Sequence, residues 1–483
     1  MDSEGRFNNT KGENMMKMAV RLVFAVSCLA TFSLLALEKP ATVPEVTRWE
    51  SGNGVLKLPT DVKRIVETKL DKAAKDLGTE GYTIDIGPRK IRITAATQTG
   101  LFYAAQTVKQ MVKTSGGNLP QGKITDVPKY RVRGFVFDVG RLPVPIEFLY
   151  EVVDIMASYK MNDLQLHLND NYIWHEDYVK QGKDPFKESY AAFRLESKLK
   201  GLTAKDVSYT KKDFMDLVAY AKKKGVNIVP EFDMPGHALA LTRVRPDLIY
   251  QGPMPHHPER RCEMMDAANP ETLKFAGELF DEYLLAEKGK KRAVFADCPV
   301  VHIGSDEFFG SAESYRRFVD GLLGHVQSRK YTPRVWGSLR RKPGKTPVRS
   351  EGVQMNIWSM DWGRAKESID LGYDIINTFD RQLYLVPTAN YYRMDRNLKG
   401  LWENWQPNVI GPDTIDPENP HFLGASWACW NDMIGPKHNG YTYKDLKETI
   451  ENVCGVLSEK MWRGEKPPRS FEAHLEVLKS LRK

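Results

Sequence analysis

Residue types that can perform acid–base chemistry recur at one place in the sequence pattern, directly after short apolar runs. Asp306 and Glu307 stand side by side in HIGSDE, and His237 ends PEFDMPGH. Tryptophans follow several other runs, and their flat rings pack well against the apolar faces of sugars. Carboxylates beside aromatic rings suit glycoside cleavage, because an acid must protonate the leaving oxygen and a negative group must stabilise the developing cation. The candidate site residues are Arg141, Asp170, His237, Asp306, Glu307, Trp336, Trp358, Tyr384, Trp430 and Asp432.

The adjacency of Asp306 and Glu307 constrains their roles. Neighbouring side chains on a regular strand point to opposite faces. Both carboxyl groups can therefore reach one pocket only if the strand ends beneath them. This arrangement favours an acid beside an orienting carboxylate over an acid that faces a nucleophile across the pocket. Glu231 and Asp233 are predicted to support neighbouring loops, and Trp174 and Trp427 are either pocket or core residues.

Apolar strand-like runs alternate with stretches of helical periodicity through most of the chain. Strands that alternate with helices pair in parallel, because the return connection needs a helix. Eight such runs predict a (β/α)8 barrel, with function at the carboxyl ends of the strands. An open doubly wound sheet is the alternative, weakened because no GxGxxG motif follows a strand. The predicted strands are 132–139, 163–169, 226–233, 300–307, 333–337, 353–358, 374–379 and 422–430, and the predicted helices are 146–160, 211–224, 270–287 and 312–328.

Two regions precede the barrel, which is predicted to occupy residues 131–483. Residues 42–128 predict a small α+β domain, with helical spacing at 61–77, strands at 82–86 and 90–95, and an amphipathic helix at 100–112. Residues 1–37 resemble a secretory signal, because an apolar run follows Lys17 and Arg21. A secreted, periplasmic or cell-surface location is expected, and membrane contact only if this segment is an uncleaved anchor.

Composition and charge narrow the function classes. The 483 residues carry a formal net charge of +8, but lysine and arginine are scattered without an aromatic–basic motif, so nucleic-acid binding is not expected. Cys262, Cys298, Cys429 and Cys454 match no zinc spacing; buried thiols are predicted, with a Cys262–Cys298 bridge left open. Adjacent histidines at 256–257 have poor geometry for one ion. No metal or cofactor is expected.

Four ordered motifs carry a family resemblance: RGFVFDVGR (133–141), YKMNDLQLHLND (159–170), VNIVPEFDMPGHA (226–238) and VHIGSDE (301–307). Together they resemble glycoside hydrolase family 20, the β-N-acetylhexosaminidases, from about residue 131 to residue 430. The preceding unit, with TGLFYAAQTVKQ, is similar to the small domain that comes before the barrel in that family.

The resemblance implies substrate-assisted catalysis on a glycan with a terminal N-acetylhexosamine. The substrate's own acetamido oxygen would attack the anomeric carbon, an exception to the two-carboxylate scheme. Glu307 would act as acid and then base, Asp306 would hold the acetamido N–H, and Tyr384 would donate to the acetamido oxygen. The remaining roles are walls for the acetyl group and ring (Trp336, Trp358, Trp430), contacts to sugar hydroxyls (Arg141) and orientation of the acid (Asp170, His237).

Three positions depart from the family pattern. Asn171 replaces the second acid of a pair, Val386 replaces an aspartate after the pocket tyrosine, and Asp432 replaces a glutamate. The last two family positions read the 4- and 6-hydroxyls, so their change should enlarge or depolarise that end of the pocket. HLNDNYIWHEDY (167–178) and AAFRLESKL (191–199) resemble a branch that includes lacto-N-biosidases. Release of a Gal-GlcNAc disaccharide is therefore an alternative, and a catalytically silent glycan-binding protein is another.

Overall fold

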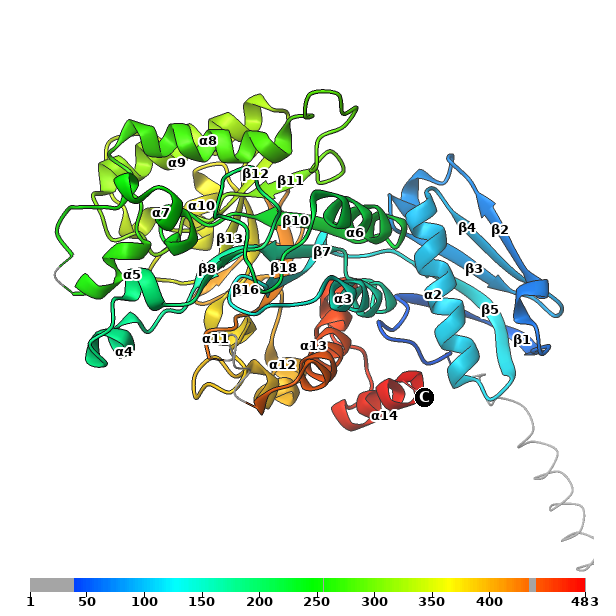
Figure 1. Ribbon diagram of the computed structural model, residues 1–483. Helices are drawn as coiled ribbons and strands as arrows, with labels where there is room; N and C mark the ends of the chain where they lie inside the picture. Colours follow the sequence, from blue (N-terminus) through cyan, green and yellow to red (C-terminus); the bar gives the residue numbers. More distant parts are fainter. Residues whose placement is uncertain (1–38, 255, 434–439, 483) are drawn as a thin grey trace, which may run out of the picture.

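The computed structural model describes residues 39–254, 256–433 and 440–482, which form a barrel and a smaller sheet domain beside it (Figure 1). The signal-like segment at 1–37 lies outside the described residues. The barrel begins at residue 132, directly after the last strand of the small domain ends at residue 126.

Eight parallel strands close into the barrel in chain order. Each strand pairs with the next, β14 pairs with β18, and β18 pairs with β6, which completes the ring. The predicted (β/α)8 barrel is therefore confirmed, and the open doubly wound sheet is wrong. The strands are β6 (Val132–Asp138), β7 (Asp163–His167), β10 (Asn227–Glu231), β11 (Val300–His302), β12 (Thr332–Trp336), β13 (Gln354–Ile357), β14 (Asp374–Asn377) and β18 (Phe422–Cys429).

Helices cover the outside of the barrel and bury their apolar faces on it. The four predicted helices are confirmed with small changes at their ends. Thr210 and Asp213 begin α6 with reciprocal side-chain-to-backbone hydrogen bonds, which satisfies amide groups that the first turn leaves free. Between β12 and β13 the chain forms only a short 3-10 turn, η5 (Leu339–Arg341), and the segment after this turn contains Pro343 and Pro347. The main helices are α3 (Ile146–Ser158), α6 (Lys211–Lys223), α8 (Pro270–Leu284), α9 (Ala312–Ser328), α10 (Ala365–Asp370), α13 (Tyr443–Arg463) and α14 (Phe471–Arg482).

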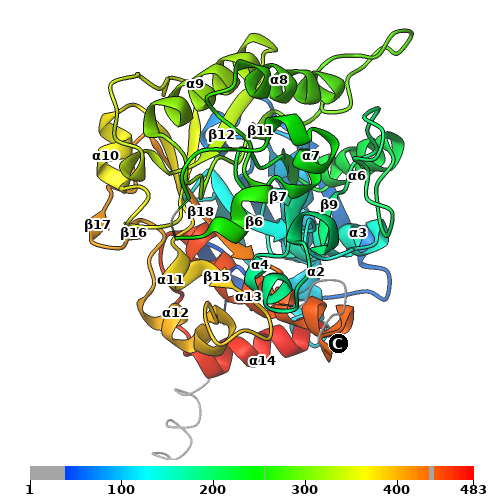
Figure 2. The same cartoon turned by 60° about the vertical axis from the view of Figure 1, so that its left-hand side comes forward.

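Short elements extend the loops at the carboxyl ends of the strands. Figure 2 turns the barrel so that several of these loops come forward, among them the one that carries β15, which pairs with β18. The elements are β8 (Asn169–Asn171), α4 (His175–Lys180), α5 (Pro185–Glu188), β9 (Ala191–Phe193), α7 (Leu239–Val244), η3 (Pro246–Leu248), η4 (Pro258–Glu263), α11 (Asp380–Leu383), β15 (Tyr384–Leu385), η6 (Met394–Asn397), α12 (Leu398–Asn404), β16 (Val409–Ile410) and β17 (Asp413–Thr414).

The small domain is a five-stranded sheet with one covering helix, α2 (Gln98–Thr114). Its strands lie in the order β1-β5-β3-β4-β2, and only β2 runs parallel to its neighbour β4. The predicted strands at 82–86 and 90–95 and the predicted helix at 100–112 are confirmed. The strands are β1 (Arg48–Lys57), β2 (Val66–Leu70), β3 (Tyr82–Ile86), β4 (Ile91–Ala95) and β5 (Asn118–Asp126).

The helix predicted at 61–77 is wrong. Two single 3-10 turns, η1 (Val62–Ile65) and η2 (Lys75–Leu77), flank the edge strand β2 instead. Val62, Ile65 and Val66 have helical spacing, but they pack only at the margin of the small core. β2 pairs with β4 along five residues, so the sheet satisfies their backbone hydrogen bonds. This tertiary pairing outweighs the weak local preference of the segment for a helix.

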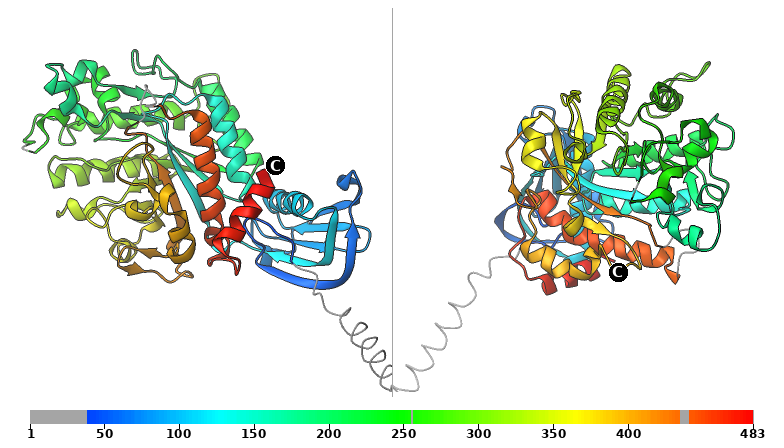
Figure 3. Two further views of the ribbon diagram at one scale, coloured as in Figure 1. Left: turned by 90° about the horizontal axis from the view of Figure 1, so that it is seen from below. Right: turned by 90° about the vertical axis from the view of Figure 1, so that its left-hand side faces the viewer.

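The small domain attaches at the amino ends of the barrel strands through buried polar contacts. Lys160 Nζ, just before β7, lies 2.8 Å from Asp126 Oδ2 of β5 and 2.7 Å from the Tyr82 hydroxyl. Trp462 of α13 donates from Nε1 to Asp126 Oδ1 at 2.8 Å, and its ring lies within the core of the small domain. Figure 3 (left) shows α14 beside α2 at this junction. A helix of the barrel domain thus contributes a side chain to the core of the small domain.

The cysteine prediction concerns residues that the structure describes, whereas the predicted membrane contact depends on the segment at 1–37, which lies outside them. Cys262, Cys298, Cys429 and Cys454 are free thiols, so the Cys262–Cys298 bridge is excluded. Cys262 Sγ instead lies 3.6 Å from the carbonyl oxygen of Glu259. Within the described ranges, no helix combines the length and the apolar character needed to cross a bilayer.

Candidate active site

The carboxyl ends of the barrel strands surround a cavity of about 490 Å³ on the side opposite the small domain. Figure 3 (right) views the molecule from that side. Trp336 lies below the cavity, and the structure brings every other predicted site residue to its wall. The lining residues are Arg141, His167, Asp170, Ile173, Trp174, Asp233, His237, Asp306, Glu307, Trp358, Tyr384, Tyr391, Tyr392, Trp430 and Asp432.

The backbone after β11 explains how two neighbouring carboxylates reach the cavity. The strand ends at His302, not at residue 307 as predicted, and Gly304 and Ser305 adopt left-handed φ values of 69° and 82°. A Cβ on Gly304 would lie 2.0 Å from Asp233 Oδ1, which accepts the Ser305 N–H at 2.9 Å. Glycine is therefore required there. Glu307 itself has a φ of 43°, an uncommon value for a side-chain-bearing residue.

Asp306 lies deep in the cavity and faces Asp233. Burial, and then the charge of Asp306, raises the pKa of Asp233 well above its usual range. Burial likewise raises the pKa of Asp306, although His237 opposes the rise. Two buried carboxyl groups in contact favour retention of a proton between them. This pair can therefore accept a hydrogen bond from a substrate N–H and absorb positive charge.

Glu307 is a paired carboxylate at the rim of the cavity. His237 Nε2 lies 3.5 Å from Glu307 Oε2, and both terminal nitrogens of Arg260 lie 3.4 Å from the same oxygen. Burial raises the pKa of Glu307, but the hydrogen bond with His237 and the charge of Arg260 outweigh it and lower the pKa to about 2. Its two cationic neighbours therefore favour the carboxylate form of Glu307.

Asp170 and Arg141 hold His237 in place from its Nδ1 side, while its Nε2 side faces Glu307. Asp170 Oδ1 lies 3.1 Å from His237 Nδ1, and Arg141 Nη2 lies 2.7 Å from Asp170 Oδ2. Burial lowers the pKa of His237, but the charge of Asp170 dominates and raises it well above its ordinary value. Arg141 is also bound by Asp138 and lies 3.5 Å from Asp432. The predicted grouping of Arg141, Asp170 and His237 thus forms one connected line toward Glu307.

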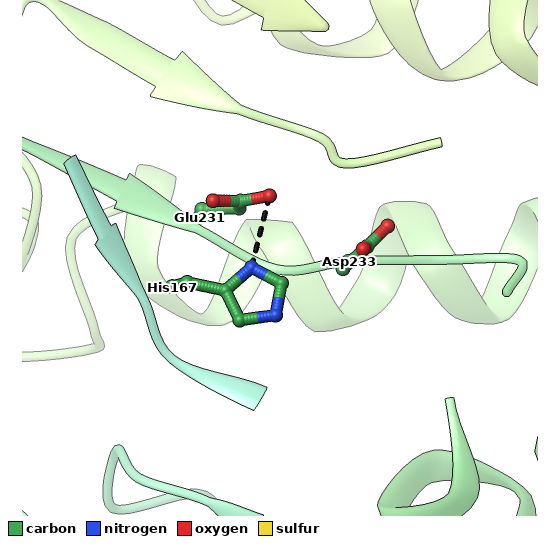
Figure 4. Close-up of side chains that lie close together, drawn as sticks. All are labelled: His167, Glu231 and Asp233. Carbon is green, nitrogen blue, oxygen red and sulfur yellow. Dashed lines mark ion pairs between the residues drawn. The ribbon is translucent and has the colours of Figure 1, made fainter. Parts of the chain in front are cut away.

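Beneath this line, the barrel interior carries a polar column. Figure 4 shows His167, Glu231 and Asp233 at the ends of β7 and β10, with His167 Nδ1 3.1 Å from Glu231 Oε1. His167 Nε2 lies 2.6 Å from Asp170 Oδ2, and Trp336 Nε1 donates to Glu231 Oε1 at 2.6 Å. Glu231 therefore supports the site from within the barrel. His167 links that support to Asp170.

Aromatic rings form the opposite wall. Trp430 lies with its ring centroid 5.7 Å from both Trp336 and Tyr384. Trp358 is fixed by a hydrogen bond from Nε1 to the Gly337 carbonyl oxygen at 3.0 Å. Burial and the charge of Asp306 raise the pKa of Tyr384 well above its usual range, so its hydroxyl is a neutral donor. Trp427 is a core residue, because its ring stacks on Phe135 at 3.9 Å.

The rim near Asp432 contains residues that sequence reasoning did not single out. Tyr391 donates to Asp432 Oδ2 at 3.0 Å, and Tyr392 donates to Asp380 Oδ2 at 2.9 Å. Val386 is fully buried and its amide bonds the Tyr392 carbonyl oxygen, so it presents no polar group to the cavity. Adjacent tyrosines shortly after Tyr384 were a usable signal. Arg260, in a loop far from any strand end, had none.

Two groups of three side chains have ligand atoms within 4.8 Å of one another: His167, Glu231 and Asp233, and Asp233, His237 and Asp306. The His167 nitrogens already face Asp170 and Glu231, and His237 faces Asp170 and Glu307. The histidine of each group is therefore already engaged in ion pairs with protein carboxylates.

Comparison with known proteins agrees with this geometry. The glycosyl hydrolase family 20 catalytic domain matches residues 130–445, and domain 2 of the same family matches residues 63–127. The chain belongs to glycosyl hydrolase family 20. The resemblance stated from the four motifs is therefore confirmed.

Three similar proteins illustrate the range of similarity. A beta-hexosaminidase of Akkermansia muciniphila is 30% identical over 273 residues, covering 55% of this chain and 51% of the relative. A lacto-N-biosidase of Bifidobacterium bifidum is 22% identical, covering 89% and 40%. The chain thus spans about half or less of these two proteins. The structure of a beta-N-acetylhexosaminidase from Bacteroides fragilis superposes with a TM-score of 0.67 at 20% identity, covering 91% and 94%.

Proposed function

We propose that this family 20 protein is an exo-acting, retaining glycosidase that releases terminal β-linked N-acetylhexosamine by substrate-assisted catalysis. The observation that carries the proposal is the arrangement of Asp306, Glu307 and Tyr384 around one cavity. Asp306 and Glu307 are adjacent in sequence, so they stand on one side of the cavity and do not face each other as an acid and a nucleophile would. The nucleophile must then come from the substrate.

The acetamido group supplies that nucleophile. Its carbonyl oxygen attacks the anomeric carbon while the glycosidic bond breaks, and the leaving oxygen takes a proton from Glu307. The positive charge that develops on the acetamido nitrogen is stabilised by the buried Asp306–Asp233 pair. Tyr384 orients the acetamido oxygen with a hydroxyl that stays neutral. Water then opens the ring-fused intermediate, and Glu307 accepts its proton, so the anomeric configuration is retained.

His237 supports both proton steps. Its pKa is raised by Asp170, and its Nε2 lies 3.5 Å from Glu307 Oε2, so it holds the proton that Glu307 needs as an acid. After the leaving group departs with that proton, Glu307 is the carboxylate required to act as a base. Coupled groups of this kind lose and gain protons as a pair.

A second candidate substrate is a Gal-GlcNAc disaccharide, released as by a lacto-N-biosidase. Two observations support it. Val386 is fully buried and provides no carboxylate at the position where the family resemblance implies one that reads a sugar hydroxyl, and Asp432 already accepts a hydrogen bond from Tyr391. The similarity to a lacto-N-biosidase over 89% of this chain points the same way. A sugar attached to the terminal N-acetylglucosamine would occupy the room at this end.

Two chromogenic substrates test the proposal: a nitrophenyl N-acetyl-β-glucosaminide and a nitrophenyl lacto-N-bioside. Turnover of the first supports an exo-hexosaminidase, and turnover of the disaccharide alone assigns a lacto-N-biosidase. Glu307→Gln should lose activity on unactivated glycans far more than on nitrophenyl substrates, because nitrophenolate leaves without a proton. Binding of either sugar without turnover would contradict both enzymes and assign a silent glycan-binding protein.

A further inference from the structure

A second cation besides His237 reaches the carboxyl group of Glu307. Arg260 lies in η4 (Pro258–Glu263), on the loop between β10 and α8, far in sequence from any strand end. Nη1 and Nη2 of its guanidinium are both 3.4 Å from Glu307 Oε2. The two cations therefore contact the same oxygen, Oε2.

The guanidinium of Arg260 is held from three sides. Its Nε pairs with Glu263 Oε1, and its Cζ lies 5.3 Å from the ring centroid of Phe309. Glu263 is in turn fixed by His175 Nε2 at 3.1 Å and by the side-chain amide of Asn171. The Arg260 side chain is only 12% exposed. Because these contacts already fix the guanidinium of Arg260, its contact with Glu307 costs little additional side-chain entropy.

Asn171, which contacts Glu263, links the support of Arg260 to a departure from the family pattern. It is the position at which this chain departs from the family's pair of acids. Its amide nitrogen contacts Glu263, and its side-chain oxygen accepts the Leu239 N–H at 3.3 Å. An aspartate there would set a second carboxylate against buried Glu263, which would repel the residue that holds Arg260. Asparagine at position 171 is therefore compatible with the Glu263 carboxylate that holds Arg260, whereas an acid would not be.

We propose that Arg260 is a positioning residue for the catalytic step: it fixes the Glu307 carboxyl group through Oε2 and stabilises the carboxylate that forms when the proton passes to the leaving oxygen. This inference rests on the proposed role of Glu307 as acid and base. The proton moves from Glu307 to the glycosidic oxygen, and the negative charge left on Glu307 is shared with Arg260. Arg260 itself neither gains nor loses a proton.

The groups that face Glu307 determine how its titration should respond. His237 and Arg260 favour its carboxylate form, whereas the neighbouring Asp306 and the hydroxyl of Tyr392 oppose it when ionised. A cation within 4–6 Å lowers a carboxyl pKa by about 1 to 3 units. Removal of Arg260 should therefore raise the pKa of the Glu307–His237 pair by about 1 to 3 units.

The test compares Arg260→Met, Arg260→Lys and Arg261→Met in the full chain. Arg261 is a matched control, because it lies on the same turn but contacts the carbonyl oxygens of Tyr250 and Gly252. For Arg260→Met, the basic limb of kcat/KM should move up by about 1 to 3 pH units, and kcat on an unactivated disaccharide should fall roughly 10- to 100-fold. Arg260→Lys should restore part of both effects, and Arg261→Met should match the parent.

A second readout follows the carboxyl group without turnover. Infrared difference spectra of the parent and of Arg260→Met, with Glu307→Gln as the blank, report protonation of Glu307 directly. The C=O band of the acid should titrate at higher pH in Arg260→Met. If the parent turns over no substrate, the proposed function fails while this spectrum still decides the role of Arg260. The proposal is overturned if neither the infrared C=O band nor the basic limb of kcat/KM moves in Arg260→Met. If Arg260→Met does not fold, an unchanged kcat in Arg260→Lys overturns the proposal instead.

Discussion

Replacement of Lys160 by methionine should loosen the small domain from the barrel. The Lys160 side chain is 1% exposed and lies 2.8 Å from Asp126, whose side chain is fully buried. Burial raises the pKa of Asp126, but the charge of Lys160 outweighs it and holds that pKa below its usual value. Methionine keeps the length and apolar body of the side chain while removing the charge, so Asp126 would be left as a buried carboxylate without a cation.

The magnitude follows from that loss. Breaking a buried ion pair by removal of one partner costs about 3–5 kcal/mol, against a total of about 5–15 kcal/mol for a folded domain. Asp126 keeps the Trp462 N–H as a donor, which offsets part of the cost. We therefore expect a loss of about 3 kcal/mol in the free energy of unfolding for Lys160→Met. Asp126→Asn alone should also be destabilising.

Urea unfolding followed by tryptophan fluorescence measures this change, since Trp462 lies at the junction. The double variant Lys160→Met/Asp126→Asn should lose less than the sum of the two single losses, because neither charge is then left unpaired. Lys212→Met, which breaks an exposed pair with Asp216, is the control and should leave the midpoint unchanged. A loss below about 1 kcal/mol in Lys160→Met, or strictly additive losses, would refute the reasoning.

Two further predictions concern the site. Tyr384→Phe should lower kcat on a nitrophenyl substrate by roughly 100-fold, because it removes the hydroxyl that orients the acetamido oxygen for attack, with little change in urea stability; a kcat within about threefold of the parent would contradict that role. For Glu263, burial raises the pKa, but Arg260 and His175 lower it to about 2. Its contribution to stability is therefore complete above the unfolded pKa near 4.5 and is lost as pH falls toward 2, amounting to about 3 kcal/mol. Glu263→Gln should flatten the decline of unfolding free energy between pH 5 and pH 2.5, measured by urea titration, and an unchanged slope would show that Glu263 is not responsible.

The barrel could be predicted from the sequence because its strands are apolar runs separated by strongly periodic helices. The edge strand β2 could not, since it is mostly exposed and is specified by pairing with β4, not by its own pattern. The residues at strand ends were predictable because a parallel barrel brings those ends together. The sequence predicts Trp336 in the pocket wall, but it lies beneath the pocket, because its position within β12 turns its indole toward Glu231.

The position of Arg260 in the site could not be predicted from the sequence. It lies on a connection whose course depends on packing against α4, α5 and α7, and no local periodicity records that course. The left-handed backbone at Ser305 and Glu307 was equally hidden, although Gly304 marked the end of the strand. Contacts built by loops depend on the whole fold, so only the positions attached to regular elements were accessible in advance.

The place of Trp462 in the core of the small domain has a consequence for the order in which the chain folds. Asp126 and Trp462 are 336 residues apart, so the small domain leaves the ribosome well before the tryptophan that completes its interior. At about 5–20 residues per second, that interval is roughly 17–67 s. Throughout it, the place that Trp462 will occupy in this core stays open, so the small domain exposes apolar surface to which a chaperone can bind.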